Sequence, residues 1–422
     1  MRFVRMGLAL GLAVVAISLP TASAQAGCGL LGLNACPPPA APSSGTAPDP
    51  GGDEKSQVPL PPAGGKLFGF NSQLYAWATT PQREVSYELA LHANAQRIGA
   101  SWNAMQPTPS SPPLPDEGGK PVGALNNKTG DLGRLDGIYL ELVNHGMKPV
   151  IMLGDAPVWA SDYANCRLLD SACRRAAAAS HLPPAAAHLS DWQRFVAAIV
   201  RRYPQAAIQP WNEPNLTPFW GDQTPNSARM ASMQCAAFQG AKGVNQATIV
   251  LSPALAVFAA PRDDGSPSFQ SYLSALYGRN LRGCMNDLSL NLYPANVLDL
   301  GAGSPLAQEF QLVRQTRATY GDASPIWITE TGSTSFPNHG DERWGISEAQ
   351  QADLNLRLYS KMMTMGDVHA VLFHSLRNAP TRAWVGQWTE PGYNYGFLRE
   401  DFSPKPVFCA FAARAGTTYS GC

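Results

Sequence analysis

The stretch AIQPWNEPN at 207–215 decides the interpretation of this chain, because a short apolar run ends there on asparagine, glutamate and proline. Runs of the same kind recur from residue 67 onward, with amphipathic helical stretches such as 191–202 and 348–365 between them. Strands that alternate with helices pair in parallel, because each helix returns the chain to the same edge. We predict strands at 67–71, 96–102, 148–153, 207–213, 247–252, 287–292, 325–330 and 369–374. Eight such units predict a single (β/α)8 barrel, an α/β fold, over 67–422.

Two long loops interrupt the regular spacing of the predicted strands. The later strands start about 40 residues apart, whereas the spacing of the early ones is looser. The excess falls in the proline-rich segment 107–121 and in 154–190, and each segment follows a predicted strand. Loops after barrel strands lie on the C-terminal rim, where barrel active sites are built. We therefore predict elongated loops around a site on that rim.

The composition is that of a large folded protein without a strong net charge. The 422 residues are 45% hydrophobic and 15% charged, with 31 lysines and arginines against 31 acidic residues. An apolar fraction this high excludes disorder for most of the chain. The neutral balance argues against nucleic acid or an anionic membrane as partner, and no transmembrane span is expected. We expect a monomer.

The N-terminal 66 residues are not expected to form a packed fold. Residues 1–26 combine a positive start, an apolar run at 7–19 and a small-x-small cleavage pattern, as a secretory signal peptide does. Residues 27–66 are rich in proline, glycine and serine, which indicates a linker. The protein is therefore predicted to be secreted, with lipid anchoring at Cys28 as an alternative.

Eight cysteines would remain after removal of residues 1–26. An even number in an exported protein predicts disulfides. Many connectivities are possible, and pairing of nearest neighbours is the simplest: Cys28–Cys36, Cys166–Cys173, Cys235–Cys284 and Cys409–Cys422. The cysteines do not have the spacing of a zinc site, and no metal or cofactor is expected.

Two glutamates end predicted strands on the same rim. Glu213 stands in WNEPN at the end of the fourth strand, and Glu330 stands in WITETG at the end of the seventh. Cleavage of a glycosidic bond needs two carboxyl groups, one to protonate the leaving oxygen and one to attack the sugar or activate water. A retaining mechanism requires a separation of about 5–5.5 Å between them. The alternative is structural: Glu213 would cap a helix and Glu330 would form a salt bridge.

The chain resembles clan A of the glycoside hydrolases, whose motifs include Asn-Glu after strand 4 and Glu after strand 7. Within that clan it is most similar to the bacterial family 39-like group, which includes exopolysaccharide glycosidases of the Psl-operon type. The matching stretches are RIGASWNAMQP (97–107), HGMKPVIMLGDAPVWAS (145–161), WNEPNLTPFW (211–220), WITETG (327–332) and FLREDFSPKPVFCAF (397–411). The resemblance implies a secreted retaining glycosidase that acts on a polysaccharide, with Glu213 as acid/base and Glu330 as nucleophile.

Two positions depart from the family pattern. Asn291 stands where the family often has histidine, two residues before Tyr293. Phe373 and His374 stand where a Trp-Tyr pair usually ends strand 8. Hydrolysis by two glutamates is compatible with both changes, but these changes prevent the assignment of a particular sugar from the family pattern.

Three further residues are candidates for supporting the two glutamates. Asn212 resembles the clan residue that binds the sugar 2-hydroxyl group, although it can also serve as a turn residue. Tyr293 ends strand 6 and can donate its hydroxyl to Glu330, or it is a core aromatic. Arg97 in strand 2 resembles an arginine that supports the nucleophile, with a plain salt bridge as the alternative.

Aromatic side chains near the strand ends are candidate platforms for the apolar faces of sugars. The tryptophans at or after predicted strand ends are Trp102, Trp159, Trp211, Trp220, Trp384 and Trp388. We favour Trp159 and Trp220 as platforms, include Trp384 among the substrate-binding residues, and expect about half of the six to be packing residues. His374 is placed to touch a substrate hydroxyl, and Glu390 is a weaker candidate.

Two other functions fit the same residues. An exo-acting xylosidase or arabinosidase on this scaffold would use the same glutamates and would differ only in its products. A carbohydrate-binding barrel without catalytic activity would not need paired carboxyl groups. The sequence leaves the sugar, the linkage and the choice between endo and exo cleavage open.

Overall fold

The computed structural model describes residues 59–60, 62, 64–72, 81–110, 130–163, 181–294, 299–335, 346–379 and 394–422. The predicted leader 1–26 and most of the predicted linker 27–66 lie outside these residues. So do most of the proline-rich loop 107–121 and the middle of the loop 154–190.

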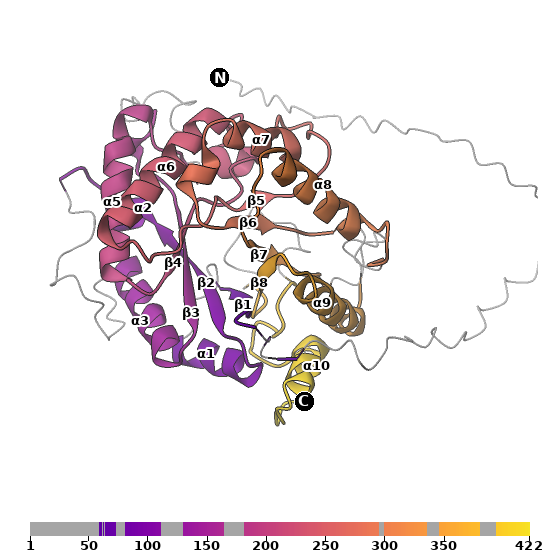
Figure 1. Cartoon of the computed structure of the whole chain (residues 1–422). Coiled ribbons are helices and arrows are strands. Elements are labelled where there is room, and N and C mark those ends of the chain that lie inside the picture. Colours follow the sequence, from indigo (N-terminus) through magenta and orange to yellow (C-terminus); the bar gives the residue numbers. More distant parts are fainter. Residues whose placement is uncertain are drawn as a thin grey trace, which may run out of the picture. The chain divides into compact units, whose positions relative to one another are not determined.

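Eight parallel strands form one sheet, as the alternating pattern predicts. The strands are β1 (Leu67–Asn71), β2 (Ala95–Ser101), β3 (Lys148–Gly154), β4 (Ala207–Pro210), β5 (Leu255–Ala256), β6 (Leu288–Asn291), β7 (Ile326–Thr331) and β8 (Val368–Phe373). Their order is β4-β3-β2-β1-β8-β7-β6-β5, so that the first strand pairs with the last. Figure 1 shows the helices around these strands. The predicted (β/α)8 architecture is confirmed.

The fifth strand differs from its prediction. We expected a strand at 247–252, whereas β5 covers only Leu255–Ala256. Val250 and Ala254 instead form isolated bridges to Ile208 and Asn212, which link the segment before β5 to β4 and to the residues that follow β4. Pro253 lies between the bridges and has no N–H to donate, so a continuous ladder cannot pass through it.

Helices pack around the sheet. They are α1 (Pro81–Ala90), α2 (Trp102–Met105), α3 (Gly130–Asn144), α5 (Leu189–Arg202), α6 (Ser227–Val244), α7 (Phe269–Tyr277), α8 (Pro305–Thr319), α9 (Glu348–Met363) and α10 (Pro406–Arg414). In α5, Trp192, Phe195, Val196 and Ile199 are fully buried, at the spacing of one helical face. In α9, Ser347 and Gln350 form a capping box that fixes where the helix begins.

Two disulfides lie in the described part of the chain. Cys235–Cys284 ties α6 to the short 3-10 helix η6 (Leu281–Cys284), and Cys409–Cys422 ties α10 to the C-terminal residues. Both match the nearest-neighbour prediction, whereas Cys28–Cys36 and Cys166–Cys173 fall outside the described residues. Among the described residues, no helix combines the length and apolarity needed to cross a bilayer.

The interior of the barrel changes from apolar to polar along the strands. Side chains near the strand starts form an apolar cluster that includes Ala95, Val150, Ala207, Trp327 and Ala370. Two residues further along β2, β4 and β7, the side chains are Arg97, Gln209 and Thr329, and all three are buried. Buried polar groups need hydrogen-bond partners, so this layer is the place to look for a site.

Candidate active site

The two glutamates lie where β4 and β7 end. Each is 8% exposed. The backbone around Glu213 is strained, with φ of 106° at Trp211 and 41° at Glu213, values that side-chain-bearing residues rarely adopt. The Glu213 N–H donates to the carbonyl of Ala254 at 2.7 Å, which holds this geometry. Backbone strain of this kind persists only where surrounding contacts stabilise it, and strained residues are concentrated at functional sites.

Both carboxyl oxygens of Glu330 accept hydrogen bonds. Arg97 donates from Nη1 to Oε1 at 2.5 Å, and the Tyr293 hydroxyl donates to Oε2 at 3.1 Å. Burial and the charge of Glu330 raise the pKa of Tyr293 well above its usual range, so its hydroxyl stays a donor. A cation and a second donor favour the negatively charged form of a carboxylate. The contact between Tyr293 and Glu330 is the one that the sequence suggested.

Glu213 has the opposite electrostatic surroundings. Burial, followed by the negative charge of Glu330, raises the pKa of Glu213 to about 8. The amide of Asn291 donates to its Oε1 at 3.0 Å, and this bond and the charges of Arg97 and Arg262 only partly oppose the rise. At neutral pH, Glu213 is therefore mostly protonated, whereas Glu330 is paired with a cation.

A buried network beneath the glutamates was missed by the sequence analysis. Gln209 accepts from Arg97 Nε at 2.5 Å and donates to Ser289 and Thr329, at 2.8 and 3.1 Å. Asn291 donates to both Asn212 and Glu213, at 3.1 and 3.0 Å. The sequence does contain one indication of this network, namely polar residues within strands that are buried on both faces. Such residues must find hydrogen-bond partners inside the barrel.

Arg97 connects the two halves of this network. Its side chain is fully buried and also donates from Nη2 to Asn212 Oδ1 at 2.8 Å. We expect Arg97→Met to lower the free energy of unfolding by about 3–5 kcal/mol, because it leaves the Glu330 carboxylate buried without its cation. Urea unfolding followed by circular dichroism measures this loss. Arg97→Lys should restore only part of the stability, since an ammonium cannot form the same forked contacts. Unchanged stability of the methionine variant would contradict this account of the pair.

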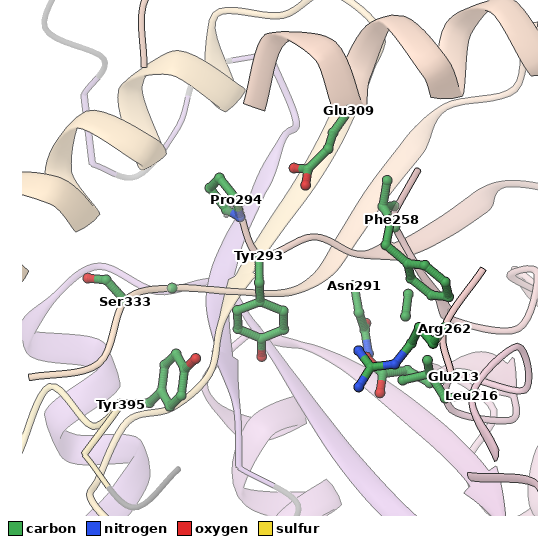
Figure 2. Close-up of a pocket in the computed structure, with 13 residues that line it drawn as sticks. Glu213, Leu216, Phe258, Arg262, Asn291, Tyr293, Pro294, Glu309, Ser333 and Tyr395 are labelled. Carbon is green, nitrogen blue, oxygen red and sulfur yellow. The ribbon is translucent and has the colours of Figure 1, made fainter. Parts of the chain in front are cut away.

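Glu213 lines a cavity of about 270 Å³ at the rim. Its walls are Glu213, Leu216, Ala256, Val257, Phe258, Arg262, Asn291, Tyr293, Pro294, Glu309, Gly332, Ser333 and Tyr395. Figure 2 shows the Tyr293 and Tyr395 rings on one side and Asn291, Arg262 and Glu213 on another. The cavity thus combines aromatic rings with carboxyl, amide and guanidinium groups, a mixture suited to a polar organic ligand.

The tryptophans give a mixed result. Trp220 does not present a face to the cavity, so its prediction as a platform is wrong. It is 1% exposed and packs edge-on against Trp211, at 6.1 Å between ring centroids. It ends the short 3-10 helix η5 (Thr217–Trp220), which turns the indole into the core. Trp102 and Trp211 are also buried and serve as packing residues.

Several other predicted site residues are not among the walls of this cavity, including Arg97, Asn212 and Glu330. Trp159 is half-buried, donates from Nε1 to the carbonyl of Gln106 at 3.1 Å and packs edge-on against Trp102. His374 is 7% exposed, and burial lowers its pKa, so that its ring is neutral. Neither residue lines the cavity described above. Trp384, Trp388 and Glu390 lie outside the described residues.

The raised pKa of Glu213 can be tested without any substrate. In the unfolded chain this carboxyl loses its proton near its ordinary pKa of 4.5, whereas the folded protein keeps the proton up to about pH 8. Folding therefore takes up a proton in this window, and stability falls as pH rises through it. We expect Glu213→Gln to raise Tm by several degrees at pH 8 and to have little effect at pH 4.5. Equal Tm differences at both pH values in calorimetry would contradict the shift.

Comparison with solved structures shows where this fold occurs. A family 39 glycoside hydrolase from Bacteroides cellulosilyticus WH2 matches with a TM-score of 0.55 and 16% identity, over 85% of this chain and 64% of that one. A GH39 β-xylosidase from Caulobacter crescentus matches with 0.55 and 16%, over 84% and 72%. The GH5_18 protein of Streptomyces cattleya, solved with GlcNAc, matches with 0.56 and 14%, over 83% and 80%. The chain spans less than two thirds of the first of these proteins.

These likenesses establish the fold. The chain has the (β/α)8 barrel found in clan A glycoside hydrolases, and its fold is like that of family 39. No family profile matches the sequence, and no curated protein does so either.

Proposed function

We propose that this protein is a secreted retaining glycosidase that cleaves O-glycosidic bonds of a polysaccharide by double displacement. One arrangement carries the proposal: a single hydrogen-bond network joins two strand-end carboxyl groups, of which Glu213 has a pKa raised to about 8 and Glu330 is paired with Arg97. Retaining glycosidases need this division, because one carboxyl must give a proton while the other attacks. In this proposal Glu213 is the acid/base and Glu330 is the nucleophile.

In the first step, a Glu330 oxygen attacks the anomeric carbon while Glu213 gives its proton to the departing glycosidic oxygen. The bond to the leaving sugar breaks, and an ester forms between Glu330 and the remaining sugar. Arg97 and Tyr293 hold the attacking carboxylate in place. Asn212 accepts from both Arg97 and Asn291, and in this proposal its amide group binds the 2-hydroxyl group.

In the second step, the same groups exchange roles. Once Glu330 is an ester, it no longer carries the negative charge that helps to raise the pKa of Glu213. The pKa of Glu213 then falls, so that it can take a proton from a water molecule. That water attacks the anomeric carbon, the ester breaks, and Glu330 returns to its carboxylate form.

The wider setting supports this proposal. The matching barrels include a family 39 glycoside hydrolase and a GH39 β-xylosidase. Two disulfides fit an exported protein, as the leader at 1–26 suggests. The polysaccharide substrate rests on the resemblance of stretches such as WNEPN to exopolysaccharide glycosidases. An exo-acting xylosidase would use the same residues and would differ in its products.

Product stereochemistry is the direct test. The purified protein would be incubated with a panel of polysaccharides and disaccharides, and proton NMR would follow the anomeric signal of each fresh product. We expect the first product to keep the anomeric configuration of the bond that was cut, with mutarotation following later. Initial appearance of the opposite anomer would indicate an inverting enzyme and would contradict the assignment of Glu330 as nucleophile.

A further inference from the structure

Glu309 occupies an unusual position on helix α8. The buried residues of this helix include Leu306, Phe310 and Val313, which mark the stripe that faces the barrel. Glu309 lies three residues after Leu306 and four before Val313, so it shares that stripe. An acidic side chain at such a position usually has a structural partner.

No structural partner for Glu309 is found among the described residues. Its Oε2 atom is buried and accepts no hydrogen bond from any part of the chain that the structure covers. Burial alone raises the pKa of Glu309 to about 8. Thr316, one heptad later on the same stripe, instead satisfies its hydroxyl by donating to the carbonyl of Leu312 at 2.8 Å. A buried polar atom without a partner destabilises the fold, which points to a role other than packing.

The carboxyl of Glu309 lines the same cavity as Glu213. Figure 2 shows it extending from α8 beside Pro294, on a different side of the cavity from Glu213 and Arg262. Arg262, the cation of the cavity wall, has an ion-pair partner in Asp264 at 3.5 Å. Because Glu309 and Glu213 line one cavity, the carboxyl with the unsatisfied oxygen is part of the proposed substrate site.

We propose that Glu309 is a substrate-binding residue that hydrogen-bonds a hydroxyl group of a neutral sugar in this cavity. A protonated carboxyl both donates and accepts, as a sugar hydroxyl does, so the two groups match. Burial without a nearby cation favours that neutral form. The inference rests on the proposed glycosidase function, because it assumes that a saccharide enters the cavity.

The test compares Glu309→Ala and Glu309→Gln with wild type, and uses Gln311→Ala, an exposed position on the same helix, as control. Calorimetric titration at pH 6 would measure binding of xylobiose, cellobiose, mannobiose and the disaccharide of glucosamine. For the neutral disaccharide that wild type binds most tightly, we expect the alanine variant to bind about tenfold or more weakly. The glutamine variant, which keeps a donor and an acceptor, and the control should stay within about threefold.

Several outcomes would overturn the inference. The first is that the alanine variant binds with unchanged affinity, and the second is that wild type binds none of these saccharides. The third is that wild type binds the glucosamine disaccharide most tightly and that both Glu309 variants lose affinity for it equally. The last result would mean that an ionised carboxylate binds an ammonium group. A lower Tm in Glu309→Ala than in wild type would indicate a structural role instead.

Hydrolysis assays on the same proteins separate this inference from the proposed function. If wild type binds a neutral disaccharide through Glu309 but cleaves no substrate, the proposed function fails while the inference stands. If wild type cleaves substrates and the Glu309→Ala variant does so with unchanged KM and kcat, the inference fails while the proposed function stands.

Discussion

Replacing Glu330 by glutamine is expected to lower kcat/KM by roughly 10⁵-fold, because an amide cannot form the glycosyl ester. The substitution keeps the shape of the side chain but leaves the Arg97 guanidinium buried without its anionic partner. Initial rates on aryl glycosides, measured with enough enzyme to detect the residual activity, give the size of the loss. Glu400→Gln, at an exposed position outside the cavity, is the matched control and should keep wild-type rates.

Substitutions at Glu330 also separate an enzyme from a carbohydrate-binding barrel. If wild type cleaves nothing across a broad glycan panel, and Glu330→Ala binds sugars as wild type does, the protein is a binder. If instead wild type is active and Glu330→Gln retains more than a tenth of that activity, another residue is the nucleophile. Folding of each variant would be checked by circular dichroism, since a lost ion pair also affects stability.

The second large effect is expected at Glu213. Glu213→Ala should lower kcat about 10⁴-fold on substrates with poor leaving groups, because the departing oxygen no longer receives a proton. Aryl glycosides with acidic leaving groups need little protonation, so their first step should be nearly unaffected. Azide, which needs no general base, should then restore turnover by attacking the glycosyl ester. Rates across a series of leaving groups, with and without azide, provide the measurement.

The pH profile adds a second readout for Glu213. In wild type, the alkaline limb of kcat/KM should fall near pH 8, where the free enzyme loses the Glu213 proton. The limb should disappear in Glu213→Ala when a leaving group that needs no protonation is used. A uniform loss across all leaving groups, with the alkaline limb unchanged, would show that Glu213 is not the acid.

Much of the barrel could be predicted because its strands are buried on both faces. Such strands form continuous apolar runs, and seven of the eight predicted strands overlap the observed ones closely. The fifth does not, because Pro253 follows that run directly and separates its isolated bridges from β5. An apolar run indicates that a segment is buried, but it does not show whether every backbone N–H along the segment can join a hydrogen-bond ladder.

The candidate site was predictable where strand ends carry charged or hydroxyl groups. Arg97, Tyr293 and Asn212 lie with Glu330 and Glu213 in one connected network. Their roles in the reaction stay predictions. Trp220 shows the limit of the same reasoning, because a position after a strand does not determine which way the next turn points a side chain.

Other members of the site needed contacts that no local pattern contains. Gln209 joins partners on β2, β6 and β7, and only the closed sheet brings those strands together. Glu309 could have been noticed from helical spacing, as an acid between Leu306, Phe310 and Val313 on the buried stripe of α8. That its carboxyl faces the cavity depends on how α8 packs over the barrel.

The joint between β4 and β5 has a consequence for how this protein would lose activity. A regular ladder joins the other neighbouring strands, with seven residue pairs in register between β2 and β3 and two between β5 and β6. At the joint, isolated bridges at Ile208 and Asn212 take its place. This joint, which has isolated bridges in place of a ladder, lies beside the residue proposed to deliver the proton. A joint with few ladder bonds can open locally at a lower free-energy cost than global unfolding. We therefore expect heat to inactivate the proposed site at temperatures where most of the protein is still folded.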